Sequence, residues 1–227
     1  MINFLIKDLY KIKNQLSCEP NNFTNSYSSY ELMHNLSIQS YKKNLKGTWT
    51  LVELMGEKND IQDCFKSTYL YIKECWHKNY PCNILYTNAD TLCVNEIDIF
   101  NQFNEFRLFT DDDPIVKGQY INGGVKYFPS HLSCDFWTIY DREISNWNDE
   151  DWLYEQNMGI NLMFSQDNFD HAKSQNWVVK QIGLVHKNLI NELNCLKFTH
   201  AILHFHSSQN PVSRLHYMED LWRKLND

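Results

Sequence analysis

The hydrophobic positions in the first half of the chain alternate between helical spacing and short strand-like runs. Gly47 and Asp60 mark two boundaries, the first as a helix C-terminal cap and the second as a helix N-cap. The pattern predicts, in order, a loop over 19–29, a helix over 29–46, a strand over 48–54, a helix over 60–80, a strand over 82–87, a helix over 96–105 and a strand over 106–109.

This alternation predicts the class of fold. A strand, a helix and a further strand in succession are typical of a largely parallel sheet with helices on its faces. The second half adds, in order, a helix over 149–164, a strand near Leu203 and a helix over 217–225. We therefore expect an α/β fold, with a mixed, mostly parallel sheet flanked by helices, in a single domain over residues 1–227. Ligands of such sheets bind at the carboxyl ends of strands, here after Thr87, Phe109 and Leu203.

Composition and charge narrow the class of protein. Hydrophobic residues make up 43% of the 227 positions, enough for one substantial core, and the net charge of -7 argues against a nucleic-acid-binding protein. The seven cysteines are irregularly spaced, so we expect reduced thiols and neither a disulfide framework nor a zinc ribbon. Because we find no signal peptide and no apolar run near the roughly 20 residues of a membrane span, we expect a soluble, cytoplasmic protein.

The segment Asn88-Ala89-Asp90 places polar groups where an apolar strand ends. A carboxylate in this position can hold Mg²⁺ or Mn²⁺ on a diphosphate, because hard cations take oxygen ligands and leave room for phosphates. The alternative is an Asx turn, in which Asn88 or Asp90 caps the segment that follows. The spacing by itself favours neither interpretation.

The segment Asn122-Gly123-Gly124 lies between apolar residues. Asn-Gly in such surroundings is a strong signal for a β-hairpin turn, and the motif by itself favours this interpretation. The functional alternative is a backbone that approaches a substrate closely at Gly123 and Gly124, with a hydrogen bond offered by Asn122.

Histidines and a carboxylate–amide pair supply further candidate groups. On a strand, His200, His204 and His206 point to one face, and two imidazoles at a strand end can bind a metal. A lone histidine in that position is more often a half-buried side chain. On the predicted helix, Glu155 and Gln156 offer a carboxylate and an amide to hydroxyl groups, or form part of an ordinary solvated face.

Taken in order, these motifs resemble those of GT-A fold glycosyltransferases. The segment Tyr86 to Leu92 resembles their Asp-x-Asp segment, which often reads Tyr-x-Asp-Ala-Asp-Thr-Leu, and Asn122-Gly123-Gly124-Val125 resembles their donor-sugar loop. The pair Glu155-Gln156 is similar to the acidic-Gln pair that these enzymes place near the reacting sugar. His204-Phe205 resembles the late segment that supplies a histidine metal ligand in retaining members.

The resemblance implies a metal-dependent hexosyl- or related transferase, with Mn²⁺ or Mg²⁺ as the cofactor. Such an enzyme moves a sugar from a nucleotide diphosphate, expected to be a UDP-sugar, to a hydroxyl of a glycan or other acceptor. Glu155 and Gln156 take the catalytic roles. The residues implied for the donor are Thr87, Asn88, Ala89, Asn122, Gly123 and Gly124, and those for the metal are Asp90, His204, Asn88 and His206.

The chain departs from the family pattern at Asn88, where the first Asp of the motif would stand. The change removes one negative charge from the implied metal site and motivates a second hypothesis, an inactive relative that binds a nucleotide sugar or glycan. Asn210 stands where many relatives carry a basic residue for the diphosphate, and Arg214 is the candidate to replace it. A nucleotidyltransferase ranks last, because residues 1–13 contain no Gly-rich, basic phosphate loop.

Overall fold

Five strands form the central sheet, in the order β2-β1-β3-β6-β5. Strand β1 (Ile2–Ile12) pairs in parallel with β2 (Thr50–Lys58) and with β3 (Cys82–Thr87). Strand β6 (Tyr120–Phe128) is antiparallel to both β3 and β5 (Arg107–Asp111), so one strand of the five opposes the others. The predicted mixed, mostly parallel sheet is confirmed. The computed structural model describes residues 1–13, 23–111, 120–151, 154–164, 178–182, 200–205 and 211–226.

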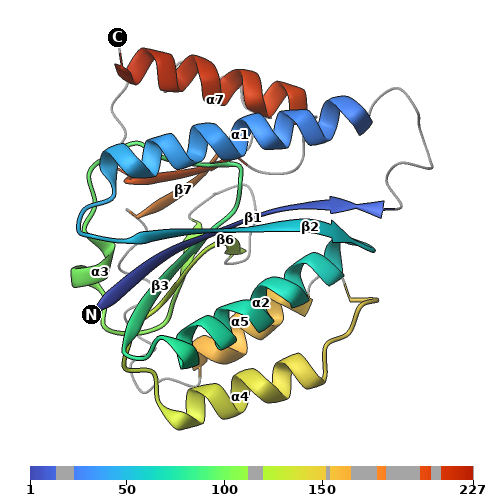
Figure 1. Ribbon diagram of the computed structural model, residues 1–227, viewed down its shortest axis with the longest axis vertical. Coiled ribbons are helices and arrows are strands. Elements are labelled where there is room, and N and C mark those ends of the chain that lie inside the picture. The colour runs from blue at the N-terminus through green and yellow to red at the C-terminus, as the bar shows by residue number, and fades with distance from the viewer. Residues whose placement is uncertain are drawn as a thin grey trace.

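Helices cover both faces of this sheet (Figure 1). One face carries α2 (Ile61–Lys78), α4 (Cys134–Ser145) and α5 (Tyr154–Phe164), and the other carries α1 (Phe23–Asn44) with α7 (Pro211–Asn226) beside it. Side chains alternate along β1, so its neighbouring residues enter different cores, one under each layer of helices. No helix in the described part of the chain is long and apolar enough to cross a membrane.

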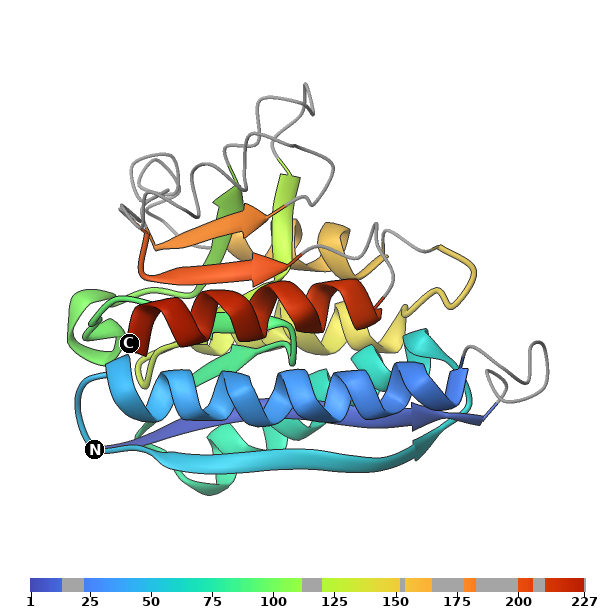
Figure 2. The same cartoon turned by 90° about the horizontal axis from the view of Figure 1, so that it is seen from above.

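A smaller sheet of three strands, in the order β4-β8-β7, lies beside α7 (Figure 2). Strand β8 (Ile202–Phe205) is antiparallel to β4 (Thr91–Cys93) and parallel to β7 (Val179–Ile182). The chain passes from β3 in the central sheet to β4 in the small sheet through residues 88–90. The segment with the predicted strand-end carboxylate therefore connects the two sheets.

Local signals located several element boundaries correctly. The Asp60 carboxylate accepts a hydrogen bond from the Asp63 backbone N–H at 2.8 Å, as predicted for the N-cap of α2. Gly47 follows the end of α1 with a φ of +88°, a conformation that glycine adopts without strain. The strand predicted over 82–87 coincides with β3.

The predicted boundaries of the first and last helices were wrong. Helix α1 begins at Phe23, inside the predicted loop, and the C-terminal helix α7 begins at Pro211 rather than near 217. The apolar side chains of these two helices, among them Met33 and Met218, pack together in one buried cluster. Leu215, in the part of α7 that the sequence did not predict, belongs to this cluster, and its packing stabilises that part of the helix.

Two other predicted helices are shorter than expected. The helix predicted over 96–105 shrinks to α3 (Ile99–Gln102), because the chain becomes extended at Phe103, whose ring is buried in the core. The helix predicted over 149–164 begins only at Tyr154. Before it, the Asn148 side chain accepts a hydrogen bond from the Glu150 backbone N–H and so favours a turn over a helix.

The hairpin favoured at Asn122-Gly123 is also wrong, because β6 runs without interruption through these residues. In its pairing with β5 the register shifts, so that Lys126 lies opposite Leu108 and Asn122 lies opposite Phe109. The extra residues of β6, which include both glycines, form a bulge. Glycine accommodates such an irregularity because it has no side chain to place.

Candidate functional site

Two backbone hydrogen bonds bring the separate sequence motifs together at residues 88–90. The Asn88 N–H donates to the carbonyl of Gly124 at 2.8 Å, and the N–H of Phe205 donates to the carbonyl of Asp90 at 2.9 Å. The strand-end segment therefore touches both β6, which carries the predicted donor-sugar loop, and β8, which carries His204. The fold places three of the four predicted motif segments in one location.

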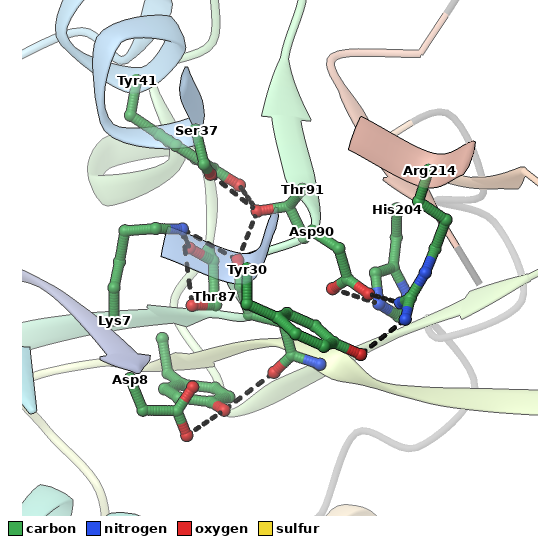
Figure 3. Close-up of polar contacts among 12 residues, drawn as sticks. Lys7, Asp8, Tyr30, Ser37, Tyr41, Thr87, Asp90, Thr91, His204 and Arg214 are labelled. Atoms are coloured by element: carbon green, nitrogen blue, oxygen red, sulfur yellow. Dashed lines mark hydrogen bonds and ion pairs between the residues drawn. The ribbon is translucent and has the colours of Figure 1, made fainter. Parts of the chain in front are cut away.

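The Asp90 carboxylate is buried between a histidine and an arginine (Figure 3). Its Oδ1 lies 3.2 Å from Nε2 of His204, and its Oδ2 accepts a hydrogen bond from Nη1 of Arg214 at 2.5 Å. Nη2 of Arg214 donates to the hydroxyl of Tyr30 on α1. Burial by itself would raise the pKa of Asp90, but the charges and hydrogen bonds of His204 and Arg214 outweigh it and lower that pKa.

Lys7, on β1, also binds the segment at residues 87–88. This β1 side chain is fully buried, and its Nζ donates to the hydroxyl of Thr87 at 2.6 Å and to the carbonyl of Asn88 at 2.8 Å. The ammonium also lies 5.0 Å from the centre of the Tyr41 ring. Burial lowers the pKa of Lys7 to about 7. Thr87, predicted as a donor-binding residue, is itself buried and uses its hydroxyl in this contact.

Helix α1 holds the far end of the segment through Thr91. The Thr91 hydroxyl donates to the carbonyl of Asn88 at 2.9 Å and lies 3.3 Å from the Tyr41 hydroxyl and 3.2 Å from the Ser37 hydroxyl. All three hydroxyl-bearing residues are buried. Together with Lys7 they fix the backbone at Asn88, so the geometry of the turn is set by two elements that the predicted motif does not include.

On the opposite face of the central sheet, Tyr86 of β3 contacts the side chain of Asn88, and Asp8 of β1 contacts Tyr86. The Tyr86 hydroxyl lies 2.9 Å from Oδ2 of Asp8 and 2.7 Å from Oδ1 of Asn88, and the Thr68 hydroxyl on α2 donates to the same Asp8 oxygen at 2.9 Å. Burial raises the pKa of the Asp8 carboxyl. The amide oxygen of Asn88 is thus engaged by Tyr86, whereas its amide nitrogen has no partner among the described residues.

Glu155, predicted as catalytic, lies on α5 and forms a buried ion pair with Lys126 of β6. The Lys126 Nζ is 2.5 Å from Oε1 of Glu155 and 4.5 Å from the centre of the Tyr86 ring. Glu155 is only 9% exposed, so the alternative of an ordinary solvated face does not apply to it. A continuous set of contacts leads from Glu155 through Lys126 and Tyr86 to Asn88.

The other predicted site residues are placed less completely. Ala89 is buried in the turn between Asn88 and Asp90. Asn122 and Gly123 lie in β6, and Gln156 lies in α5, but their side-chain surroundings fall outside what the structure describes. His206 lies outside the described residues.

Sequence reasoning missed Lys7, Asp8 and Lys126. It named Arg214 as a candidate for the diphosphate, and the structure pairs this residue with Asp90. A signal for Lys7 and Asp8 was present, since they are adjacent charges inside the apolar run Phe4-Leu5-Ile6 and Leu9. A strand in the interior of a parallel sheet is covered on both faces, so both charged side chains must be buried there and must have partners.

The described residues do not fit a divalent cation in this arrangement. A hard cation needs several oxygen ligands, and the one carboxylate at the turn is already bound by the Arg214 guanidinium. The amide oxygen of Asn88 is bound by Tyr86. Within the described ranges, no group of three or more His, Cys, Asp or Glu side chains could hold a metal ion.

Comparison with solved structures identifies the fold. The chain matches glycosyltransferase GlyE of Streptococcus pneumoniae TIGR4 with a TM-score of 0.51 and 14% identity, over 99% of this chain and 62% of that one. It also matches a glycosyltransferase involved in glycosylation of the major capsid of PBCV-1 (TM-score 0.49, 12% identity, 96% and 100% covered) and an active-site mutant of LgtC (0.44, 10%, 98% and 96%). The predicted glycosyltransferase fold is confirmed by the GlyE match, of whose length the chain spans 62%.

No protein-family model matches the sequence, and no curated protein is significantly similar to it.

Proposed function

We propose that this protein is a glycosyltransferase that moves a sugar from a nucleotide diphosphate, expected to be a UDP-sugar, to a hydroxyl group of an acceptor. The observation that carries the proposal is the meeting of Asn88, Gly124 and the β8 strand through two backbone hydrogen bonds at the carboxyl end of β3. Ligands of α/β sheets bind at such strand ends. The glycosyltransferase fold supports the same conclusion.

The reaction breaks the bond between the anomeric carbon and the β-phosphate oxygen, and the electron pair of that bond stays on the phosphate. The acceptor oxygen forms the new bond to the anomeric carbon and loses its proton. In our proposal the diphosphate lies at the turn of residues 88–90, and the sugar lies along the glycine-containing part of β6. The turn is rigid because Lys7 and Thr91 hold the Asn88 carbonyl, so the site is already formed when the donor arrives.

Glu155 is the carboxylate that we assign to the reacting centre. Lys126 binds its Oε1, and Oε2 has no partner among the described residues. Oε2 can therefore take the proton of the acceptor hydroxyl or stabilise positive charge that develops on the sugar ring. Lys126 acts as a positioning residue, because it fixes the carboxylate beside β6 without contacting the substrate. No step in this scheme depends on a divalent cation.

The test is release of UDP from a panel of UDP-sugars without acceptor, measured with Mn²⁺ and with EDTA. We expect one donor to be hydrolysed slowly, and Glu155→Gln to lower its kcat by about 10²- to 10⁴-fold. Glu150→Gln, an exposed carboxylate shortly before α5, is the matched control and should retain wild-type turnover. Wild-type kcat in Glu155→Gln would refute the role of this residue, and a panel without turnover or binding would refute the transferase.

A second function, binding of a nucleotide sugar without catalysis, is favoured by one observation. Asn88 replaces the first carboxylate of the motif, and its amide oxygen is held by Tyr86. Titration calorimetry with the same donor panel separates the two functions. Tight binding of a donor that is not turned over, even when candidate acceptor sugars are added, would identify a binding protein.

A further inference from the structure

The charge of Asp90 is balanced within the protein itself. Arg214 binds one carboxylate oxygen at 2.5 Å and His204 lies 3.2 Å from the other, and all three residues are less than 10% exposed. A guanidinium keeps its positive charge at any physiological pH. A divalent cation that approached Asp90 would therefore meet a fixed like charge in a poorly hydrated place, where repulsion is strong.

Asn88 contributes a donor rather than an acceptor to the same place. An amide could bind a cation only through its oxygen, and that oxygen accepts a hydrogen bond from Tyr86 at 2.7 Å. Tyr86 is buried, and its hydroxyl also lies 2.9 Å from Oδ2 of Asp8, so the two oxygens share its single proton. The half-buried Asn88 side chain is left with its N–H groups for a ligand.

A third observation points to an anion. Nε of Arg214 is buried and has no hydrogen-bond partner among the described residues. Buried N–H groups are rarely left without an acceptor, because the loss of hydration is costly. Phosphate oxygens are the acceptors for which a guanidinium is best suited, since they match its planar set of donors.

We infer that the site binds the diphosphate of its donor without a divalent cation, through the N–H groups of Arg214 and Asn88. The inference rests on the proposed function and adds to it the way in which the leaving group is neutralised. It departs from the Mn²⁺ or Mg²⁺ predicted from the sequence. Around the turn, the charge of Asp90 faces the guanidinium of Arg214 and the imidazole of His204, so these three residues carry no net negative charge to attract a metal.

The experiment measures UDP binding by titration calorimetry, and UDP-sugar turnover, in EDTA and again with Mn²⁺ or Mg²⁺. We expect the Kd and kcat to change less than about threefold between the two conditions. Turnover that requires the metal would overturn the inference while leaving the transferase intact. If no donor is turned over, the binding data decide: UDP binding in EDTA supports the inference, and binding only with metal, or no binding at all, overturns it.

Two variants assign the effect to the named groups. Arg214→Gln should weaken UDP binding in EDTA by about 10- to 100-fold, as expected for lost hydrogen bonds to a charged group. Arg223→Gln, on the exposed side of the same helix, is the matched control and should bind like wild type. Unchanged UDP binding by a folded Arg214→Gln protein would contradict the inference.

Asn88→Asp provides a test that keeps the Arg214 contact in place. The substitution preserves size but replaces the amide N–H groups with a negative charge beside the phosphates. We expect UDP binding in EDTA to weaken by about tenfold or more, since one donor is lost and a repulsive charge is gained. Equal or tighter binding in EDTA would refute the role given to the amide. Thermal unfolding by circular dichroism checks that each variant is folded.

Discussion

Two charged clusters meet the turn at residues 88–90 from different faces of the central sheet, and they are built differently. The α7 cluster consists of Tyr30, Asp90, His204 and Arg214, and it joins helices α1 and α7 to the small sheet. The α5 cluster consists of Asp8, Tyr86, Lys126 and Glu155, and it lies under α2 and α5 against aromatic rings.

The two clusters differ in the groups that they offer to a ligand. In the α7 cluster a single carboxylate is matched by an arginine and a histidine, so the cluster has donors to offer to an anionic ligand. In the α5 cluster the ion pair of Lys126 and Glu155 is internal, and it holds the Glu155 carboxylate at a fixed place beside β6. We expect changes in the α7 cluster to alter mainly ligand binding, and changes in the α5 cluster to alter turnover and stability.

The largest effect on stability is expected from Lys126→Met. The substitution leaves the Glu155 carboxylate buried without its cation, which typically costs about 3–5 kcal/mol in the free energy of unfolding. The double variant Lys126→Met with Glu155→Gln should recover at least half of this loss, because the unpaired charge is gone. Urea unfolding at pH 7 measures both. A single variant within about 1 kcal/mol of wild type would mean that Glu155 is hydrated rather than buried.

The next effect comes from Lys7, which lies on the α1 side of the turn. Its pKa is lowered to about 7 in the folded protein, so the unfolded chain binds more protons between that pH and the ordinary lysine pKa. Stability due to this group therefore rises as the pH increases from 7 to 9, by about 2 kcal/mol. Lys7→Met should remove that part of the pH dependence of unfolding. An unchanged slope in Lys7→Met would show that the ammonium stays charged in the folded protein.

The smallest expected effect compares the two clusters most directly. The contributions of their aspartates, Asp90 and Asp8, to the free energy of unfolding should change with pH in opposite directions. The pKa of Asp90 is lowered, so its ion pairs stabilise the protein above the ordinary carboxyl pKa and are lost as the pH falls through the folded value. The pKa of Asp8 is raised, so its carboxyl destabilises the protein as the pH rises above the unfolded value.

We therefore expect Asp90→Asn to lower stability at pH 7 and Asp8→Asn to raise it, each by about 1 kcal/mol. The Asp8→Asn difference should vanish below the ordinary carboxyl pKa, where Asp8 is protonated in both states, and the Asp90→Asn difference should vanish only below the folded pKa of Asp90. Thermal unfolding of the two variants from pH 7 downward makes the measurement. Effects of the same sign at pH 7 would mean that the two carboxyls do not differ in their environment as the structure indicates.

Part of this site could be predicted from the sequence because its signals are local. Asn88-Ala89-Asp90 directly follow an apolar strand, so they lie at the carboxyl end of that strand in any sheet. This prediction needs no knowledge of the rest of the fold. The cap at Asp60 is local for the same reason. The hairpin at Asn122-Gly123 failed because β6 pairs with β5 through Asn122, and this pairing outweighs the turn preference of two residues.

The sequence by itself determined the α/β class, the buried strand β3 and the polar segment that follows it, since hydrophobic spacing and capping act over a few residues. Only the tertiary structure decided what surrounds Asp90. Arg214 is 124 residues away from Asp90 along the chain and Tyr30 is further still from Arg214, so no local pattern links them. Buried charges must find partners, and the partners of Asp90 are chosen by the packing of α1 and α7.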